Sequence, residues 1–165
     1  MTSIIKATIK DIPHIQRIAR GTWPAAYSHL ISQAQIEYML ELMYNTEELT
    51  RQIEGVYTFL LAVVDGEPIG FAGFSPYEDE DGKYKLHKLY VLPTTQKTGA
   101  GKELLQATED TAKANNAHTL LLTVNKNNNA TSFYNRMGFE TTKSVTTDIG
   151  EGYVMDDYIM EKKLS

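Results

Sequence analysis

The chain has 165 residues, 42% of them hydrophobic, and it contains no cysteine. This length predicts a single domain, residues 1–165, with a core of ordinary size, and the lack of cysteine excludes disulfide scaffolds, thiol catalysis and cysteine zinc sites. The net charge is −5, whereas nucleic-acid binders usually carry an excess of basic residues, so we expect no nucleic-acid partner.

The N-terminal part of the chain is predicted to begin with a strand and a helix. Residues 4–9 form the strand, because apolar side chains alternate along one of its faces. A helix with a stripe of isoleucines follows, and Gly21 is expected to end it. The next segment, 22–31, is predicted to be an aromatic loop that holds Trp23 and Tyr27.

Two more helices and a β-rich region come next. Ser32 caps one helix, and Thr46 opens the other. Asp65-Gly66 between two β-prone runs predicts a hairpin. The remaining predicted elements are strands 57–64, 68–75, 83–92, 118–124, 139–147 and 152–162 and helices 99–115 and 130–137. This order predicts an α/β (α+β) domain whose central strand–helix–strand unit, 86–124, is parallel and right-handed.

A glycine-containing turn, Gln96-Lys97-Thr98-Gly99-Ala100-Gly101, separates a predicted strand from a predicted helix. Glycines let the backbone approach a ligand closely, and the first amides of a helix attract an anion. The turn is therefore either a phosphate site or an ordinary glycine entry to a helix. A Walker A motif is excluded because Glu103 replaces its hydroxyl residue, and a dinucleotide fingerprint because Leu104 replaces its third glycine.

Two sequence blocks form a recognisable pair. The first is Leu89-Tyr90-Val91-Leu92-Pro93 with Gln96-x-x-Gly99-x-Gly101, and the second is Val124-Asn125 with Asn127-x-x-Ala130-x-x-Phe133-Tyr134-x-x-x-Gly138-Phe139. Together they resemble the GNAT superfamily of N-acetyltransferases. The segment with Trp23, Tyr27 and Tyr38 also resembles the PaiA-type polyamine acetyltransferases. The resemblance implies a GNAT-like single domain with a mixed, mostly antiparallel sheet.

The resemblance also implies acetyl-coenzyme A as the acetyl donor, and it assigns cofactor-binding residues. Backbone amides would hold the pyrophosphate at Gln96, Lys97, Thr98, Gly99, Ala100, Gly101 and Lys102. The pantetheine arm would pair with the backbone of Leu89, Tyr90 and Val91. Asn127 would contact that arm, Phe133 would wall the slot, and Tyr134 would lie near the thioester sulfur.

Acetyl transfer needs an acid, an oxyanion donor and a base, and these residues could supply them. Tyr134 would protonate the leaving sulfur, and a backbone amide of Tyr90 or Val91 would stabilise the developing oxyanion. An attacking alkylamine must first lose a proton, because its pKa is about 10. His87, a carboxylate acting through water, or solvent would take that proton.

The acceptor is expected to contact Trp23, Tyr27 and His87, since aromatic faces suit an ammonium group. Tyr38 and the acidic residues Asp148, Glu151, Asp156 and Asp157 are further candidates. The alternative is that Trp23 and Tyr27 only pack a loop and that Asp156 and Asp157 mark an exposed strand edge. The histidines show no ligand spacing with carboxylates, so no metal is expected.

The predicted function is acetyl transfer to a primary amine of a small, polyamine-like molecule by direct attack in a ternary complex. A protein N-terminal or lysine acetyltransferase and an acyl-coenzyme A-binding regulatory module remain alternatives. The longest apolar run, 57–64, is far shorter than the ~20 residues that span a bilayer. We therefore expect a cytoplasmic protein without a membrane partner, and the long closing strands leave a homodimer open.

Overall fold

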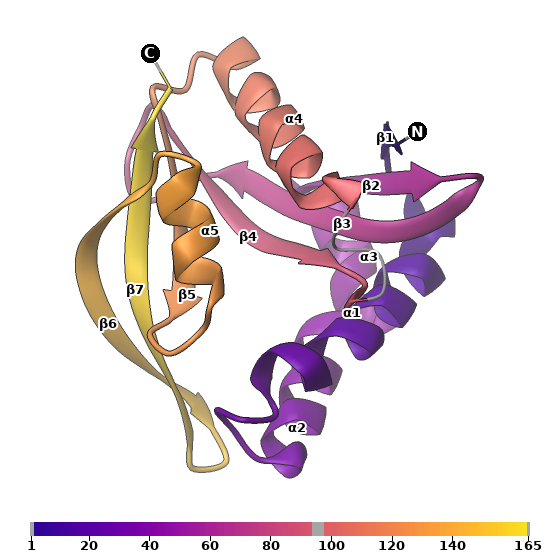
Figure 1. Ribbon diagram of the computed structural model, residues 1–165, viewed down its shortest axis with the longest axis vertical. Helices are drawn as coiled ribbons and strands as arrows, with labels where there is room; N and C mark the ends of the chain where they lie inside the picture. Colours follow the sequence, from indigo (N-terminus) through magenta and orange to yellow (C-terminus); the bar gives the residue numbers. More distant parts are fainter. Residues whose placement is uncertain (1, 94–97, 165) are drawn as a thin grey trace.

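Seven strands form one sheet in the computed structural model, which describes residues 2–93 and 98–164 (Figure 1). The strands are β1 (Thr2–Lys6), β2 (Thr58–Val64), β3 (Glu67–Pro76), β4 (Lys83–Val91), β5 (Thr119–Asn125), β6 (Glu140–Gly150) and β7 (Tyr153–Lys163). The helices are α1 (Ile12–Tyr27), α2 (Gln33–Tyr44), α3 (Thr46–Glu54), α4 (Ala100–Ala114) and α5 (Ala130–Arg136), with a 3-10 turn at Ile9–Asp11. None of the helices in the described part of the chain is long and apolar enough to cross a membrane.

The sheet order is β1-β2-β3-β4-β5-β7-β6. Strands β4 and β5 pair in parallel and are connected by α4, whereas the other neighbouring strands pair antiparallel. The predicted parallel strand–helix–strand unit is therefore confirmed, as is the mixed, mostly antiparallel α/β (α+β) fold class.

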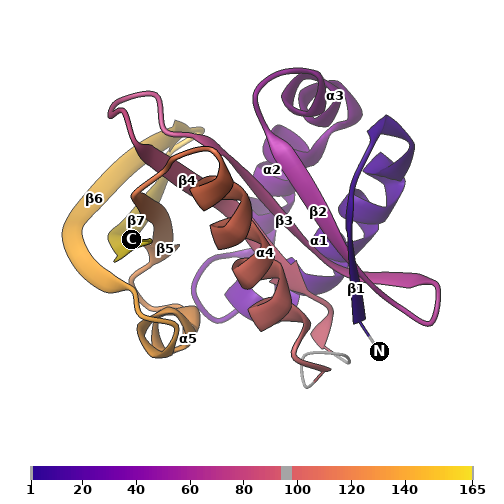
Figure 2. The same ribbon diagram turned by 90° about the horizontal axis from the view of Figure 1, so that it is seen from above.

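Helices cover both faces of this sheet (Figures 1 and 2). On one face, α1, α2 and α3 enclose a core that contains Trp23 and Phe71. On the other face, α4 and α5 enclose a second core with Leu104, Leu120 and Tyr134. The inner strands thus present alternate side chains to two different helical layers, whereas the edge strand β6 is mostly exposed.

Most predicted caps and turns are confirmed. In the β2–β3 hairpin, Asp65 and Gly66 have φ of 51° and 80°, as a tight two-residue turn requires. The Ser32 side chain caps α2 by accepting the Gln35 N–H at 3.1 Å. Helix α3 begins at Thr46 as predicted, and its cap is the preceding asparagine.

The prediction that the first helix ends at Gly21 is wrong. Helix α1 continues through Pro24 to Tyr27, so the predicted aromatic loop is largely helical. The apolar stripe continues at helical spacing, and Trp23 is only 2% exposed. Gly21 instead allows close packing, because a Cβ at this position would lie 2.8 Å from Cδ2 of Leu92.

The predicted strand 4–9 is also too long at its C-terminal end. The chain turns after Thr8, whose N–H donates to the Asp11 carboxylate at 2.9 Å. This capping box opens the 3-10 turn and brings the chain into α1. The isoleucine at position 9 thus belongs to a helical turn despite its strand propensity.

Strands β4 and β5 pair along only part of their length. Parallel pairing joins Lys83–Leu86 to Thr119–Leu122, and beyond it the strands diverge (Figure 1). The register between β3 and β4 shifts at His87, which is the extra residue of a β-bulge. A bulge bends its strand and increases the local twist. The second half of β4 therefore turns away from β5 and leaves an opening in the sheet.

Candidate active site

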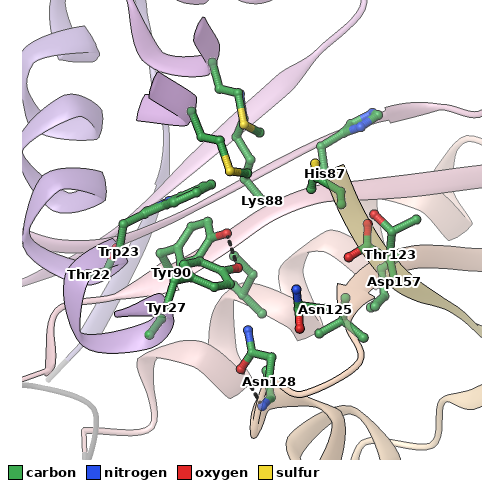
Figure 3. A pocket seen from close by; sticks show the side chains of 18 of the residues that line it. Thr22, Trp23, Tyr27, His87, Lys88, Tyr90, Thr123, Asn125, Asn128 and Asp157 are labelled. Carbon is green, nitrogen blue, oxygen red and sulfur yellow. Dashed lines mark hydrogen bonds between the residues drawn. The ribbon is translucent and has the colours of Figure 1, made fainter. Parts of the chain in front are cut away.

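A cavity of about 990 Å³ occupies the opening between β4 and β5 (Figure 3). Its walls come from β4, the end of β5, part of β7 and residues of all five helices. The cavity thus contacts both helical layers, and a long ligand could pass from one face of the sheet toward the other.

The structure brings about half of the predicted cofactor residues to this cavity. Those that line it are Leu89, Tyr90, Val91, Gly101, Phe133 and Tyr134. At the beginning of α4, beside Gly101, lie Thr98, Gly99, Ala100 and Lys102. Gln96 and Lys97 lie outside the described residues. Asn127 is exposed and lines a smaller pocket, whereas the main cavity is lined by Asn125, Asn128 and Asn129.

The beginning of α4 suits an anionic ligand. Gly99 is the N-cap and has a φ of 80°, a conformation that favours glycine. A Cβ at Gly101 would lie 3.8 Å from Val91 and 3.9 Å from Phe133, so the missing side chain leaves room at the cavity wall. The first N–H groups of α4 have no partner within the helix. These features fit the pyrophosphate and arm of acetyl-coenzyme A.

Tyr134 reaches the cavity from α5 and is held by aromatic packing. Its ring makes edge contacts with Phe133 and Phe139 at centroid distances of 5.3 and 5.6 Å. Burial raises the pKa of its hydroxyl well above the ordinary value, so the hydroxyl stays protonated at neutral pH. Tyr134 therefore carries a proton that it could donate.

An aromatic wall lies on the α1 side of the cavity, where the sequence predicted acceptor contacts. The ring centre of Trp23 lies 4.7 Å from that of Tyr27 and 5.9 Å from that of Tyr90. The hydroxyls of Tyr27 and Tyr90 are 2.9 Å apart (Figure 3). Trp23 and Tyr27 both line the cavity, because α1 extends past the glycine that was expected to end it.

His87 lines the cavity at the bulge of β4 and is neutral. Its Nε2 lies 2.7 Å from the Ser75 hydroxyl. Its ring stacks on the ring of Tyr57, with 4.4 Å between the two ring centres. Burial, with nearby lysine charges, lowers the pKa of His87 to about 3. A group with such a low pKa is a poor proton acceptor at neutral pH.

A buried lysine near the bulge is a feature that sequence reasoning missed. Lys88 Nζ donates to Gln52 Oε1 at 3.0 Å and lies 4.8 Å from the Tyr44 ring centre. Gln52 in turn donates to Glu48 at 2.6 Å. Burial lowers the pKa of Lys88 to about 8. Alternation along β4 could have placed Lys88 beside Tyr90, but its partners on α3 depend on tertiary packing.

The acidic candidates separate into exposed and buried residues. Asp148 and Glu151 are exposed, and Asp156 is exposed and pairs with Lys126 at 3.0 Å. Asp157 is only 5% exposed and lines the cavity. The alternative of an exposed strand edge is wrong for Asp157, because β7 lies between β5 and β6.

Tyr38 does not line the cavity. Tyr38 donates to the backbone oxygen of Ile149 at 2.8 Å and packs against the β6–β7 hairpin. Within the described residues, histidine and acidic side chains form no group of three that could hold a metal ion.

Comparisons with known proteins agree with this geometry. The acetyltransferase (GNAT) domain family matches residues 28–160. A spermidine N(1)-acetyltransferase of Thermoplasma acidophilum is 29% identical over 166 residues, covering 97% of this chain and 96% of that protein. An uncharacterized N-acetyltransferase of Bacillus subtilis is 31% identical over 110 residues, or 64% of this chain and 61% of that protein.

A solved structure resembles the whole fold. The PaiA N-acetyltransferase from Thermoplasma acidophilum, in complex with coenzyme A, matches with a TM-score of 0.85 and 28% identity. The match covers 99% of each chain.

Proposed function

Because this chain belongs to the GNAT family of acetyltransferases, and is an N-acetyltransferase that uses acetyl-coenzyme A, we propose that its acceptor is a primary amine of a small, polyamine-like molecule. We propose further that the amine attacks directly, in a complex that holds both substrates. The chain has no cysteine to carry a covalent acyl group.

The observation that carries this proposal is the divergence of β4 and β5 around one continuous cavity. The edge of β4 at Leu89 and Tyr90 would pair with the amides of the pantetheine arm, in the manner of an added strand. The beginning of α4, around Gly101, would hold the pyrophosphate. Acetyl-coenzyme A held by these residues would supply an activated acyl group.

The residues around that point support the chemistry of transfer. A backbone amide of Tyr90 or Val91 would stabilise negative charge on the acyl oxygen. Tyr134, which burial keeps protonated, would protonate the leaving sulfur. Both groups belong to ordered elements, so they need little reorganisation during the reaction.

The α1 side of the cavity supports a small amine acceptor. Trp23, Tyr27 and Tyr90 form an aromatic wall that could contact an ammonium or an alkyl chain. Helices α1 and α2 contribute the walls there. The similarity to a spermidine acetyltransferase over nearly the whole chain favours polyamine-like amines.

A panel of acceptors tests the proposal. The protein is mixed with acetyl-coenzyme A and with diamines, polyamines, amino acids or peptides with free N-termini and lysines. Thiol release and product mass are then measured. We expect acetylated diamines or polyamines, with much slower reaction of peptides. Acetylation of peptides alone would overturn the small-molecule acceptor, and cofactor binding without any acetylated product would overturn catalysis.

A further inference from the structure

Asp157 is a buried carboxylate without a close partner. It is 5% exposed, and no hydrogen bond or ion pair joins its side chain to another residue in the ranges 2–93 and 98–164. Enclosing an unpaired carboxylate opposes folding, because the charge loses part of its hydration even where its oxygens keep contact with the cavity. An unpaired carboxylate at a cavity wall, with a perturbed environment, is typical of a functional site.

The sheet register places Asp157 on the acceptor side of the cavity. It lies opposite Asn125 on β5, so both side chains share one face of the sheet. The neighbouring β5 residues Leu122 and Val124 pack in the core beneath α4, which directs Asn125 to the other face. This is the face that carries α1 and the aromatic wall (Figure 3).

The charged groups around Asp157 come from several elements. Lys85 on β4 and Lys126 after β5 lower its pKa, whereas Asp156 raises it. Tyr27 on α1 is close enough for Asp157 to raise its pKa. Burial is the largest influence, and the net result is a carboxyl pKa above the ordinary value of aspartate. A carboxylate with a raised pKa holds a transferred proton better than an exposed one does.

We propose that Asp157 receives the ammonium group of the acceptor and removes its proton. This inference rests on the proposed N-acetyltransferase reaction and identifies the base for it. Asp157 takes one proton from the ammonium, which frees the nitrogen lone pair to form the C–N bond. Tyr134 protonates the sulfur as the C–S bond breaks and regains a proton from the nitrogen. Asp157 then releases its proton to solvent, so one proton leaves per acetyl transferred.

The substitution Asp157→Asn tests this role against a matched control. Asn keeps the size of the side chain but cannot take the proton. We expect kcat/KM for the amine to fall at least about 100-fold, with coenzyme A affinity by calorimetry unchanged. Asp110→Asn removes an exposed carboxylate from α4, outside the cavity lining, and it should stay within about threefold of the unsubstituted protein. Asp157→Asn activity within threefold would overturn the proposal.

A second readout uses the acceptor itself. An analogue of the accepted amine with fluorine near the nitrogen has a lower ammonium pKa and needs little help to lose its proton. The defect of Asp157→Asn should therefore shrink at least about tenfold with the fluorinated amine. An equal defect with both amines would show a packing role and overturn the assignment.

Thermal unfolding distinguishes a catalytic role of Asp157 from a structural one. If Asp157 serves the reaction, Asp157→Asn should melt at the same temperature or higher, because a buried charge is removed. A lower melting temperature together with an equal defect for both amines would overturn the proposal. If the unsubstituted protein acetylates no amine, the proposed function itself fails, which is a different result from an active but insensitive Asp157→Asn.

Discussion

The hydroxyl of Tyr27 on α1 lies 2.9 Å from the hydroxyl of Tyr90 on β4. The contact joins the helix that walls the acceptor side to the strand beside which the acetyl donor would bind. Burial raises the pKa of both tyrosines, so both hydroxyls are protonated at neutral pH. One of them donates to the other, and neither carries charge.

We expect the effects of Tyr27→Phe and Tyr90→Phe to be non-additive. Each single substitution leaves the other, half-buried hydroxyl without this partner and should lower the free energy of unfolding by about 0.5–1.5 kcal/mol. The double substitution leaves no unpaired hydroxyl and should cost no more than the larger single effect. Urea unfolding of the four proteins measures the coupling. A double substitution that costs the sum of the two single effects would contradict a direct interaction.

Tyr134→Phe should separate catalysis from binding. Phenylalanine keeps the ring contacts with Phe133 and Phe139 but has no proton to donate. We expect kcat to fall about 100-fold, while the dissociation constant of coenzyme A changes less than threefold. Steady-state kinetics and calorimetry check the two quantities. Tyr77→Phe, on the loop after β3, serves as the control, and an unchanged kcat in Tyr134→Phe would remove its acid role.

Gly101→Ala should stabilise the fold and weaken cofactor binding. The added methyl group would make ordinary contacts with Val91 and Phe133, and alanine favours a helix over glycine by about 0.5–1 kcal/mol. The same methyl group would occupy the space that the proposed cofactor needs. We expect coenzyme A affinity to fall about tenfold, equivalent to about 1.4 kcal/mol.

Calorimetry and thermal unfolding test this pair of opposite effects. Lys113→Ala, at the exposed C-terminal end of the same helix, should change neither quantity much. Unchanged coenzyme A affinity in Gly101→Ala would show that the cofactor passes elsewhere.

The low pKa of His87 predicts a specific dependence of stability on pH. Its pKa is about 3 in the folded protein and near 6.5 when unfolded, so the unfolded chain binds more protons between these values. The free energy of unfolding from this group therefore rises with pH in that window, by at most about 1.4 kcal/mol per pH unit, and is lost on acidification. His87→Gln should flatten the dependence. Urea unfolding between pH 4.5 and 7.5 provides the comparison, and equal slopes for the two proteins would refute the shifted pKa.

Local sequence patterns predicted the elements that local interactions determine. The hairpin at Asp65-Gly66 and the cap at Ser32 depend on residues next to each other, and both are confirmed. The parallel unit around α4 was also predictable, because a strand–helix–strand order leaves one favoured arrangement. Gly21 misled the prediction because its role is close packing against Leu92, a contact that no short window contains.

The site was harder to predict wherever it depends on strand order. Asp157 directly follows Asp156 in the sequence, and a pair of adjacent acidic residues on a strand also suits an exposed edge. Its burial follows from the insertion of β7 between β5 and β6. Lys88 similarly acquires its environment from α3, which is far from β4 in the sequence.

The two parts of the sheet, β1–β4 and β5–β7, are joined by the parallel pairing of Lys83–Leu86 with Thr119–Leu122. The pantetheine arm of acetyl-coenzyme A, bound between the diverging ends of β4 and β5, would connect the two parts beyond this short paired region. By mass action, binding to the folded chain at one hundred times Kd adds about 2.7 kcal/mol to the free energy of unfolding. We therefore expect resistance to proteolysis to increase with the supply of acetyl-coenzyme A, which would make the lifetime of the enzyme depend on its own donor.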